Sequence, residues 1–141
     1  MMKIEIEGWV VNVDVEKTKK TYGLIKESGC LACGCNYCLN YLKNLPDVMP
    51  DQIRAFFESA GVDINKDAEV YQEGEIDNST NYYGGEYYLW GTIISKPESD
   101  VSTLGKLSFK FIAPTALAQE EFKKDGALCF SFHTELKWLL N

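Results

Sequence analysis

Apolar and polar residues alternate along the first part of the chain, which is the pattern of a β-strand. Ile4 and Ile6 share one phase, and the apolar positions change phase after Gly8. Because a shift of one residue moves every side chain to the other face, this change predicts a β-bulge or a sharp bend within one long strand. A polar loop over 16–20 and a second, antiparallel strand over 22–26 are expected to follow.

Apolar residues recur at helical spacing in the second quarter of the chain. Leu39, Leu42 and Leu45 predict a helix that begins at the cysteine-rich segment and ends at Pro46. A second helix is predicted, with Pro50 near its first turn and Gly61 just after its end. Its apolar positions follow the spacing of one helix face and are Ile53, Phe56, Phe57 and Ala60. Together the two helices form a helical hairpin inserted between strands.

Strand patterns return in the second half of the chain. They cover residues 68–73, 82–94, 107–111 and a segment that begins at 127, with a polar loop over 74–81 and a short helix over 116–124. This order predicts an α+β fold: a mostly antiparallel, bent sheet of five or six strands with a helical hairpin insertion and a short helix in the C-terminal half. No linker or repeat interrupts the pattern, so a single domain is expected over residues 1–141.

The composition and net charge of the chain disfavour some classes of binding partner. The chain has 141 residues, with 14 Lys and Arg against 21 Asp and Glu and a net charge of −7, which disfavours binding to nucleic-acid phosphates. No apolar run reaches membrane-spanning length, and the first residues lack the pattern of a secretory signal. We therefore expect a cytoplasmic protein with neither a nucleic-acid nor a membrane partner. In that reducing compartment, an odd count of five cysteines favours free or metal-bound thiols over disulfides.

The most distinctive pattern is a cluster of cysteines where strand gives way to helix. Cys30, Cys33, Cys35 and Cys38 form two Cys-x-x-Cys pairs, the spacing that aims two sulfurs at one zinc ion. The sequence therefore predicts a structural zinc site, with Cys30 or His133 as the fourth ligand. Only one residue separates the two pairs, whereas zinc sites usually separate them by about a dozen residues or more.

Two other interpretations of the cysteines stay open. A helix start lowers the pKa of a thiol, so Cys35 and Cys38 fit the Cys-x-x-Cys pair of a thiol–disulfide redox protein. Alternatively, the same two cysteines are small apolar residues of the helix stripe and bind nothing. Iron–sulfur ligation is conceivable, but the spacing departs from the common ferredoxin patterns.

An aromatic run in the second half of the chain offers a different candidate site. Tyr83, Tyr87 and Trp90 are expected to line a ligand pocket or a protein interface, or else to pack in the core. An exposed aromatic face would favour a homodimer. No phosphate-binding loop, nucleophile elbow, zinc-protease motif or dinucleotide fingerprint is present, and no catalytic residue is predicted. The sequence thus favours a small binding or interaction domain over an enzyme.

One resemblance supports a single domain. The segment 33–41, which reads Cys-Gly-Cys-Asn-Tyr-Cys-Leu-Asn-Tyr, together with segments 68–71, 83–88 and 138–140, resembles a family of uncharacterised bacterial proteins over nearly the whole chain. That family has no known activity, so the resemblance implies a bacterial domain and no mechanism. Cys30 lies outside the shared motif, which makes Cys33, Cys35 and Cys38 the better ligand candidates.

Overall fold

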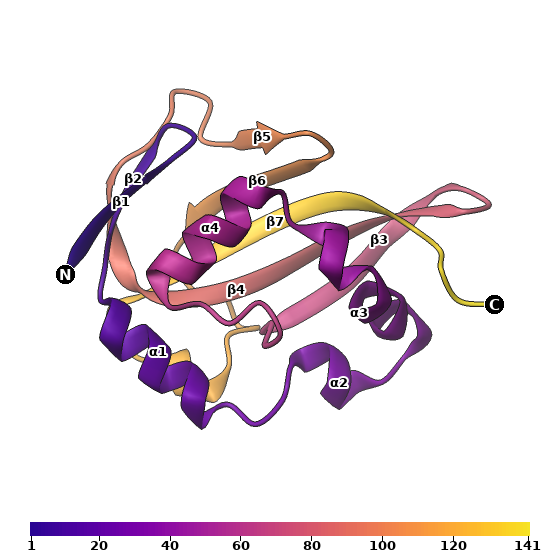
Figure 1. Ribbon diagram of the computed structural model, residues 1–141, viewed down its shortest axis with the longest axis horizontal. Coiled ribbons are helices and arrows are strands. Elements are labelled where there is room, and N and C mark those ends of the chain that lie inside the picture. Colours follow the sequence, from indigo (N-terminus) through magenta and orange to yellow (C-terminus); the bar gives the residue numbers. More distant parts are fainter.

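The protein is built around one antiparallel sheet, seen in a computed structural model that describes residues 1–141 (Figure 1). Its strands are β1 (Met2–Ile6), β2 (Trp9–Val13), β3 (Glu69–Asp77), β4 (Thr80–Ser95), β5 (Ser102–Leu104), β6 (Leu107–Ile112) and β7 (Ala127–Lys137). Six of the seven strands follow the order β1-β2-β4-β7-β6-β5, and β3 also pairs with β4. The helices are α1 (Val15–Leu24), α2 (Gly29–Cys33), α3 (Asn36–Val48) and α4 (Asp51–Ala60), with a short 3-10 turn over Glu120–Phe122. The predicted α+β class is confirmed.

Strand β4 is the axis of the sheet, because it pairs with three other strands along its sixteen residues. One edge pairs with β7 from Thr80 to Trp90. The other edge is shared: its first half pairs with β3, and its last residues pair with β2. Between the residues of β4 that pair with β3 and those that pair with β2, side chains of helix α1 hydrogen-bond to the backbone of β4. This edge of β4 is therefore covered by two strands and one helix.

The two faces of the sheet are covered differently. Helices α3 and α4 lie across one face (Figure 1), where Phe57 packs against Tyr87 at a centroid distance of 5.0 Å. The next residue of β4, Tyr88, points to the opposite face because successive side chains of a strand alternate. There the segment 113–124 covers one end of the sheet, and Phe122 packs against Tyr88 and Trp90. The aromatic residues of β4 therefore contribute to the core on both faces.

The predicted helical hairpin is present, but its first helix continues beyond Pro46, where it was predicted to end. Pro46 lies inside α3, which continues to Val48. The guanidinium group of Arg54, in α4, donates hydrogen bonds to carbonyl oxygens at the end of α3, including that of Leu45 at 3.0 Å. These bonds satisfy carbonyl groups that would otherwise lack partners at a helix end. Helix α4 matches its prediction and ends at Gly61, whose φ of 83° is in the left-handed region.

Three local predictions near the N-terminus are wrong. Gly8 does not bend one long strand: Glu7 and Gly8 form the turn that joins β1 to β2, and both have positive φ. Neither the loop over 16–20 nor the strand over 22–26 forms, because helix α1 begins at Val15 and runs to Leu24. The side chain of Asp14 caps that helix by accepting a hydrogen bond from the backbone N–H of Lys17.

Two predictions in the second half also need correction. The segment expected to be a helix over 116–124 contains only the 3-10 turn Glu120–Phe122. Most of the polar loop predicted over 74–81 extends β3 and β4 into a longer hairpin, with Asp77 opposite Thr80. No helix combines the length and the apolar character that a membrane span requires.

Candidate metal centre

Three cysteines of the predicted cluster come together where α2 meets α3. Helix α2 ends at Cys33, and Gly34 turns the chain with a φ of 67°. Cys35 then caps α3, and its Sγ accepts a hydrogen bond from the backbone N–H of Cys38 at 3.5 Å. The Sγ atoms of Cys33, Cys35 and Cys38 all lie within 4.8 Å of one another. These three residues, called the thiol cluster below, could coordinate a metal ion.

The N-terminal end of α2 is fixed against the start of β3. The Ser28 side chain caps the helix by accepting a hydrogen bond from the N–H of Leu31 at 3.0 Å. The N–H of Gly29 donates to the carbonyl oxygen of Asp67 at 2.9 Å. A Cβ atom at Gly29 would lie only 2.5 Å from the carbonyl oxygen of Ala68, so glycine permits this close approach of helix and strand. The contact sets the position from which α2 presents Cys33.

The thiols differ in burial and in acidity. Cys33 and Cys35 are exposed, whereas Cys38 is buried. Hydrogen bonding to the Cys35 sulfur, first from the N–H of Cys38, lowers the pKa of the Cys35 thiol. Burial raises the pKa of Cys38 to about 12. The exposed side of the cluster therefore holds the thiol that ionises most readily, next to a buried thiol that strongly favours its protonated form.

Cys30 lies beside the thiol cluster but is not one of the three grouped sulfurs. It is fully buried, and its thiol is within hydrogen-bonding reach of Cys38. Burial and the nearby carboxylate of Asp67 raise the pKa of the Cys30 thiol well above its usual value. Of the four predicted ligands, three are thus brought together and Cys30 is adjacent to one of them.

The dimensions of the thiol cluster are close to those of a zinc site. A Zn–S bond of about 2.3 Å in a tetrahedral site places the sulfur atoms about 3.8 Å apart. The observed separations, within 4.8 Å, need a contraction of at most about 1 Å, which side-chain rotation can supply. Because Cys33 and Cys35 are exposed, an ion can reach the thiol cluster directly from solvent.

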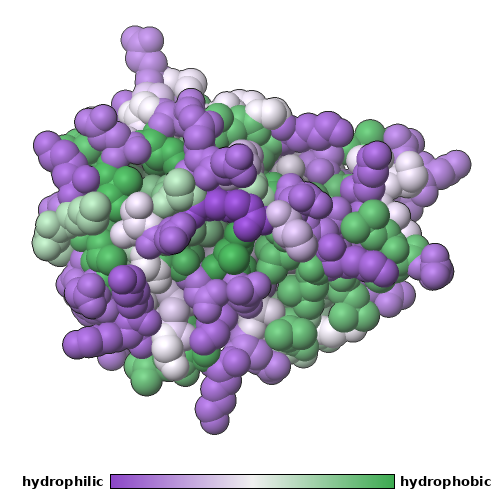
Figure 2. All heavy atoms as spheres, in the orientation of Figure 1, coloured by the Kyte–Doolittle hydropathy of each residue, from purple (hydrophilic) through white to green (hydrophobic).

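The segment that carries the thiol cluster contains no charged residue and several exposed apolar ones. No charged residue occurs from Ser28 to Leu42, although a quarter of the whole chain is charged. Three exposed apolar residues accompany the cysteines: Leu31, Tyr37 and Leu39. Figure 2 shows hydrophobic residues gathered over the region of α2 and α3. We call this set of three residues the α2–α3 patch.

The base of the site is fixed by Tyr83 and by the C-terminal residues. The Tyr83 hydroxyl donates to the carbonyl oxygen of Tyr37 at 2.8 Å and accepts from the amide group of Asn40 at 3.3 Å. The Asn40 side chain also accepts a hydrogen bond from the N–H of Leu139 at 2.7 Å. Trp138 packs edge-on against Tyr37. The apolar C-terminal residues, whose docking place the sequence did not reveal, therefore dock on the first turns of α3.

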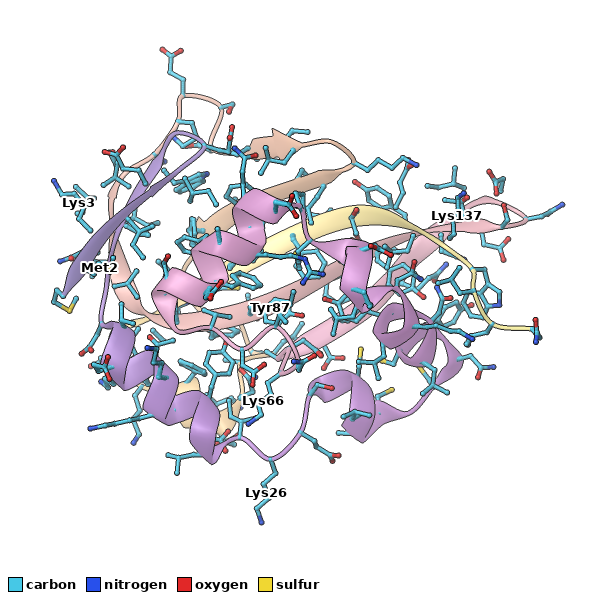
Figure 3. The ribbon with its side chains drawn as sticks, in the orientation of Figure 1. Met2, Lys3, Lys26, Lys66, Tyr87 and Lys137 are labelled. Carbon is cyan, nitrogen blue, oxygen red and sulfur yellow. The ribbon has the colours of Figure 1, made fainter.

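Of the two interpretations of the aromatic run, a binding surface or core packing, the structure shows core packing for Tyr83, Tyr87 and Trp90. Tyr83 and Tyr87 are fully buried, and Trp90 is 3% exposed. Figure 3 shows Tyr87 between the sheet and the helices, where its hydroxyl donates to the carbonyl oxygen of Ile64. Trp90 donates its indole N–H to the hydroxyl of Thr21. The exposed aromatic side chain of β4 is that of Tyr82.

His133, the alternative fourth ligand, is not part of the thiol cluster. It stacks on Tyr82, which is the neighbour of Tyr83 in β4 and therefore points to the opposite face of the sheet. Its Nδ1 atom pairs with the carboxylate of Glu73. The prediction of His133 as a ligand is wrong, because the sheet lies between it and the cysteines.

Two residues that support the site were not predicted from the sequence. Asn40 is a fully buried polar residue in the middle of a helix, and it joins α3 to Tyr83 and to the C-terminal residues. Asp67 is 1% exposed and has one carboxylate oxygen, Oδ2, without a hydrogen-bond partner. Asn40 offered one weak signal, since an asparagine on the inward face of a helix needs a specific partner.

The chain matches no known protein family, no curated protein and no solved structure. Its function must therefore be inferred from the geometry of its own residues.

Proposed function

We propose that the thiol cluster binds a structural zinc ion that joins α2 to α3 within a small binding or interaction domain. The observation that carries the proposal is the placement of three Sγ atoms, from Cys33, Cys35 and Cys38, within 4.8 Å of one another. The residues fit the group, because thiolates are the preferred ligands of structural zinc. Bound zinc would supply a cross-link between two helices whose only covalent connection is a tight turn at Gly34.

Cys30 is the proposed fourth ligand. It belongs to α2, as Cys33 does, and it is buried like Cys38. Four thiolates would make a closed site, which is typical of a structural ion. With only three thiolates, the fourth position would be open to water.

The α2–α3 patch supports a role in binding. Its apolar side chains are exposed around the thiol cluster, and a contiguous exposed apolar surface is typical of an interaction site. A metal ion in the thiol cluster would hold this surface in one conformation, which reduces the entropy lost when a partner binds. The ion would thus contribute to binding without contacting the partner.

The test is metal titration of the apoprotein, prepared by chelation under reducing conditions. Cobalt(II) serves as a spectroscopic substitute for zinc, because its thiolate charge-transfer band reports the number of sulfur ligands and its visible bands report tetrahedral geometry. We expect one ion per chain and a band that zinc abolishes by displacement. Cys35→Ser should reduce metal affinity by about tenfold or more, and Cys30→Ser should reduce the intensity of the thiolate band.

The matched control is Cys129→Ser. Cys129 is buried in β7, two residues before Ser131, and Ser131 lies opposite Glu86 on the sheet face away from the thiol cluster. Its substitution should leave metal affinity unchanged. Equal metal binding by the Cys35→Ser variant and the wild-type protein, or no binding by the reduced wild-type protein, would show that the thiol cluster is not a metal site.

A second candidate function is favoured by one observation, the hydrogen bond from the Cys38 N–H to the Cys35 sulfur. This bond lowers the pKa of an exposed thiol that has a second thiol beside it, as a thiol–disulfide redox protein requires. Cys35 and Cys38 would pass two electrons and two protons to a substrate disulfide and become a disulfide themselves. A defined reduction potential for this pair in the metal-free protein, lost in Cys38→Ser, would support this function over a structural ion.

A further inference from the structure

Strand β1 leaves one edge of the sheet without a neighbour. It is the first strand in the sheet order, and its one partner is β2. Figure 3 shows Met2 and Lys3 on this strand at the margin of the molecule. A row of backbone N–H and C=O groups at a free edge is a template for pairing with another strand.

The turn between β1 and β2 determines which backbone groups point outward. Glu7 and Gly8 have φ of 44° and 86°, as a two-residue type I′ hairpin requires. In such a hairpin the flanking residues, Ile6 and Trp9, exchange hydrogen bonds, and bonded and non-bonded pairs then alternate along the strands. Lys3 and Glu5 therefore belong to non-bonded pairs, and their N–H and C=O groups point to the free edge.

We propose that two copies of this chain associate through antiparallel pairing of β1 with β1, with Ile4 opposite Ile4 on the two-fold axis. In this register Lys3 of one copy lies opposite the partner subunit's Glu5, and the same pair repeats on the other side of the axis. The outward N–H and C=O groups of Lys3 and Glu5 then meet across the interface and can exchange four hydrogen bonds. The two sheets become one continuous sheet.

The alternation of charged and apolar residues in β1 favours the register with Ile4 opposite Ile4 over its neighbours. Residues directly opposite each other in an antiparallel pair share a face, so a shift by one residue would place charged Lys3 opposite apolar Ile4. A shift by two residues would place Lys3 opposite Lys3 or Glu5 opposite Glu5, which like charges oppose. With Ile4 on the axis, opposite charges face each other on one side of the sheet, and Met2, Ile4 and Ile6 meet apolar residues on the other.

A groove lies beside the face of β1 that carries Ile4 and Ile6. It has a volume of about 320 Å³ and runs between β1 and α4; Ile4, Ile6 and Phe56 line it together with polar residues that include Glu5 and Gln52. Met2, at the open end of the same strand face, is 49% exposed. The partner subunit's Met2 and Ile4 would extend this apolar stripe next to the groove.

The test uses two charge-reversal variants, Lys3→Glu and Glu5→Lys, and measures mass by sedimentation and native mass spectrometry at low ionic strength. The wild-type protein should be a dimer, and each variant alone should dissociate with a Kd raised about tenfold or more, because like charges then face each other. An equimolar mixture of the two variants should form a heterodimer, since two acidic side chains on β1 of one variant then face two basic side chains on β1 of the other. The double variant Lys3→Glu/Glu5→Lys should dimerise like the wild-type protein.

Two further variants separate the charge effect from the backbone contact. Glu5→Pro removes one outward N–H and should weaken the dimer, while its bonds to β2 are unaffected because Glu5 makes none there. Lys106→Glu changes the same charge at an exposed position after β5 and should leave the dimer intact. Because Lys3 and Glu5 are exposed, circular dichroism should show that all variants fold.

A monomeric wild-type protein at millimolar concentration would overturn the proposal, as would a mixture of the two variants that remains monomeric. Dimerisation that persists in the presence of a chelator is expected, because β1 and the thiol cluster lie at different ends of the sheet (Figure 1). The result is therefore independent of whether the thiol cluster binds metal.

Discussion

The side-chain hydroxyl of Tyr22 bonds to both backbone groups of Tyr88: it donates to the carbonyl oxygen at 2.6 Å and accepts from the N–H at 3.2 Å. The backbone groups of Trp90 also have partners at this end of the chain. Its N–H donates to the Thr18 hydroxyl, and its carbonyl oxygen accepts from the N–H of Asp14. These bonds occupy the interval of the β4 edge that neither β3 nor β2 reaches. Helix α1 thus replaces a strand by means of side-chain hydroxyl groups.

Removing the Tyr22 hydroxyl should destabilise the protein. In Tyr22→Phe the buried N–H and C=O of Tyr88 lose their partners, and we expect the free energy of unfolding to fall by about 1–3 kcal/mol. Urea denaturation followed by fluorescence measures this change. Tyr82→Phe is the matched control, because Tyr82 is exposed, and its effect should stay within about 0.5 kcal/mol. Equal stability of both variants would contradict the bridging role of α1.

Asp67 should make stability depend on pH between about 4 and 6. Burial raises the pKa of this carboxyl group to about 6 from a usual value of 3.8. The folded protein therefore holds a proton that the unfolded chain has lost in this interval, and stability must fall as the pH rises through it. We expect a loss of about 1–3 kcal/mol by pH 7. Asp67→Asn should remove this slope, as measured by urea denaturation at several pH values; the same slope in both proteins would assign it to other groups.

Two glycine-to-alanine substitutions should change stability in opposite directions. At Gly29 a Cβ atom would lie 2.5 Å from the carbonyl oxygen of Ala68, so α2 must move away from β3. We expect Gly29→Ala to destabilise the protein by about 1–3 kcal/mol and to weaken metal binding. Gly23 lies in α1 with nothing within 4 Å of its Cβ position, and Gly23→Ala should stabilise by about 0.5–1 kcal/mol. Thermal denaturation compares the two, and a neutral Gly29→Ala would mean that α2 is not fixed by this contact.

The five thiols should react with an alkylating reagent at different rates. Cys35 is exposed and its pKa is lowered, so in the metal-free protein it should react first at neutral pH. Cys30 and Cys129 are fully buried and should react only after unfolding. Peptide mass spectrometry of a labelling time course gives the order. Added zinc should protect Cys33, Cys35 and Cys38 together, and labelling that zinc does not change would count against a metal site.

The sequence predicted what depends on local periodicity. Helix α4 was predicted closely because Ile53, Phe56 and Phe57 mark one helix face and Gly61 ends the helix. The nearness of Cys33, Cys35 and Cys38 also followed from sequence, since a left-handed residue at Gly34 keeps the chain compact over so short a segment.

Features that depend on distant partners could not be predicted in the same way. Residues 22–26 alternate like a strand, yet Tyr22 belongs to a helix whose inner residues, including Thr18, bond to the edge of β4. The segment 116–124 contains helix-forming residues, but Thr115 is held by the buried carboxylate of Glu86 and Phe122 by packing against Trp90. In each case a partner about thirty or more residues away in sequence determines the local conformation.

Strand β7 follows both of its neighbours in the chain, yet it lies between β4 and β6. A ribosome produces a chain from its N-terminus, so β4 emerges with one edge open and the β5–β6 hairpin emerges with no strand to join. The sheet is complete only after β7 has been synthesised and has paired with β4 on one side and β6 on the other. The nascent chain must therefore carry an open strand edge until β7 has been synthesised. Until then, a chaperone would protect this edge from aggregation.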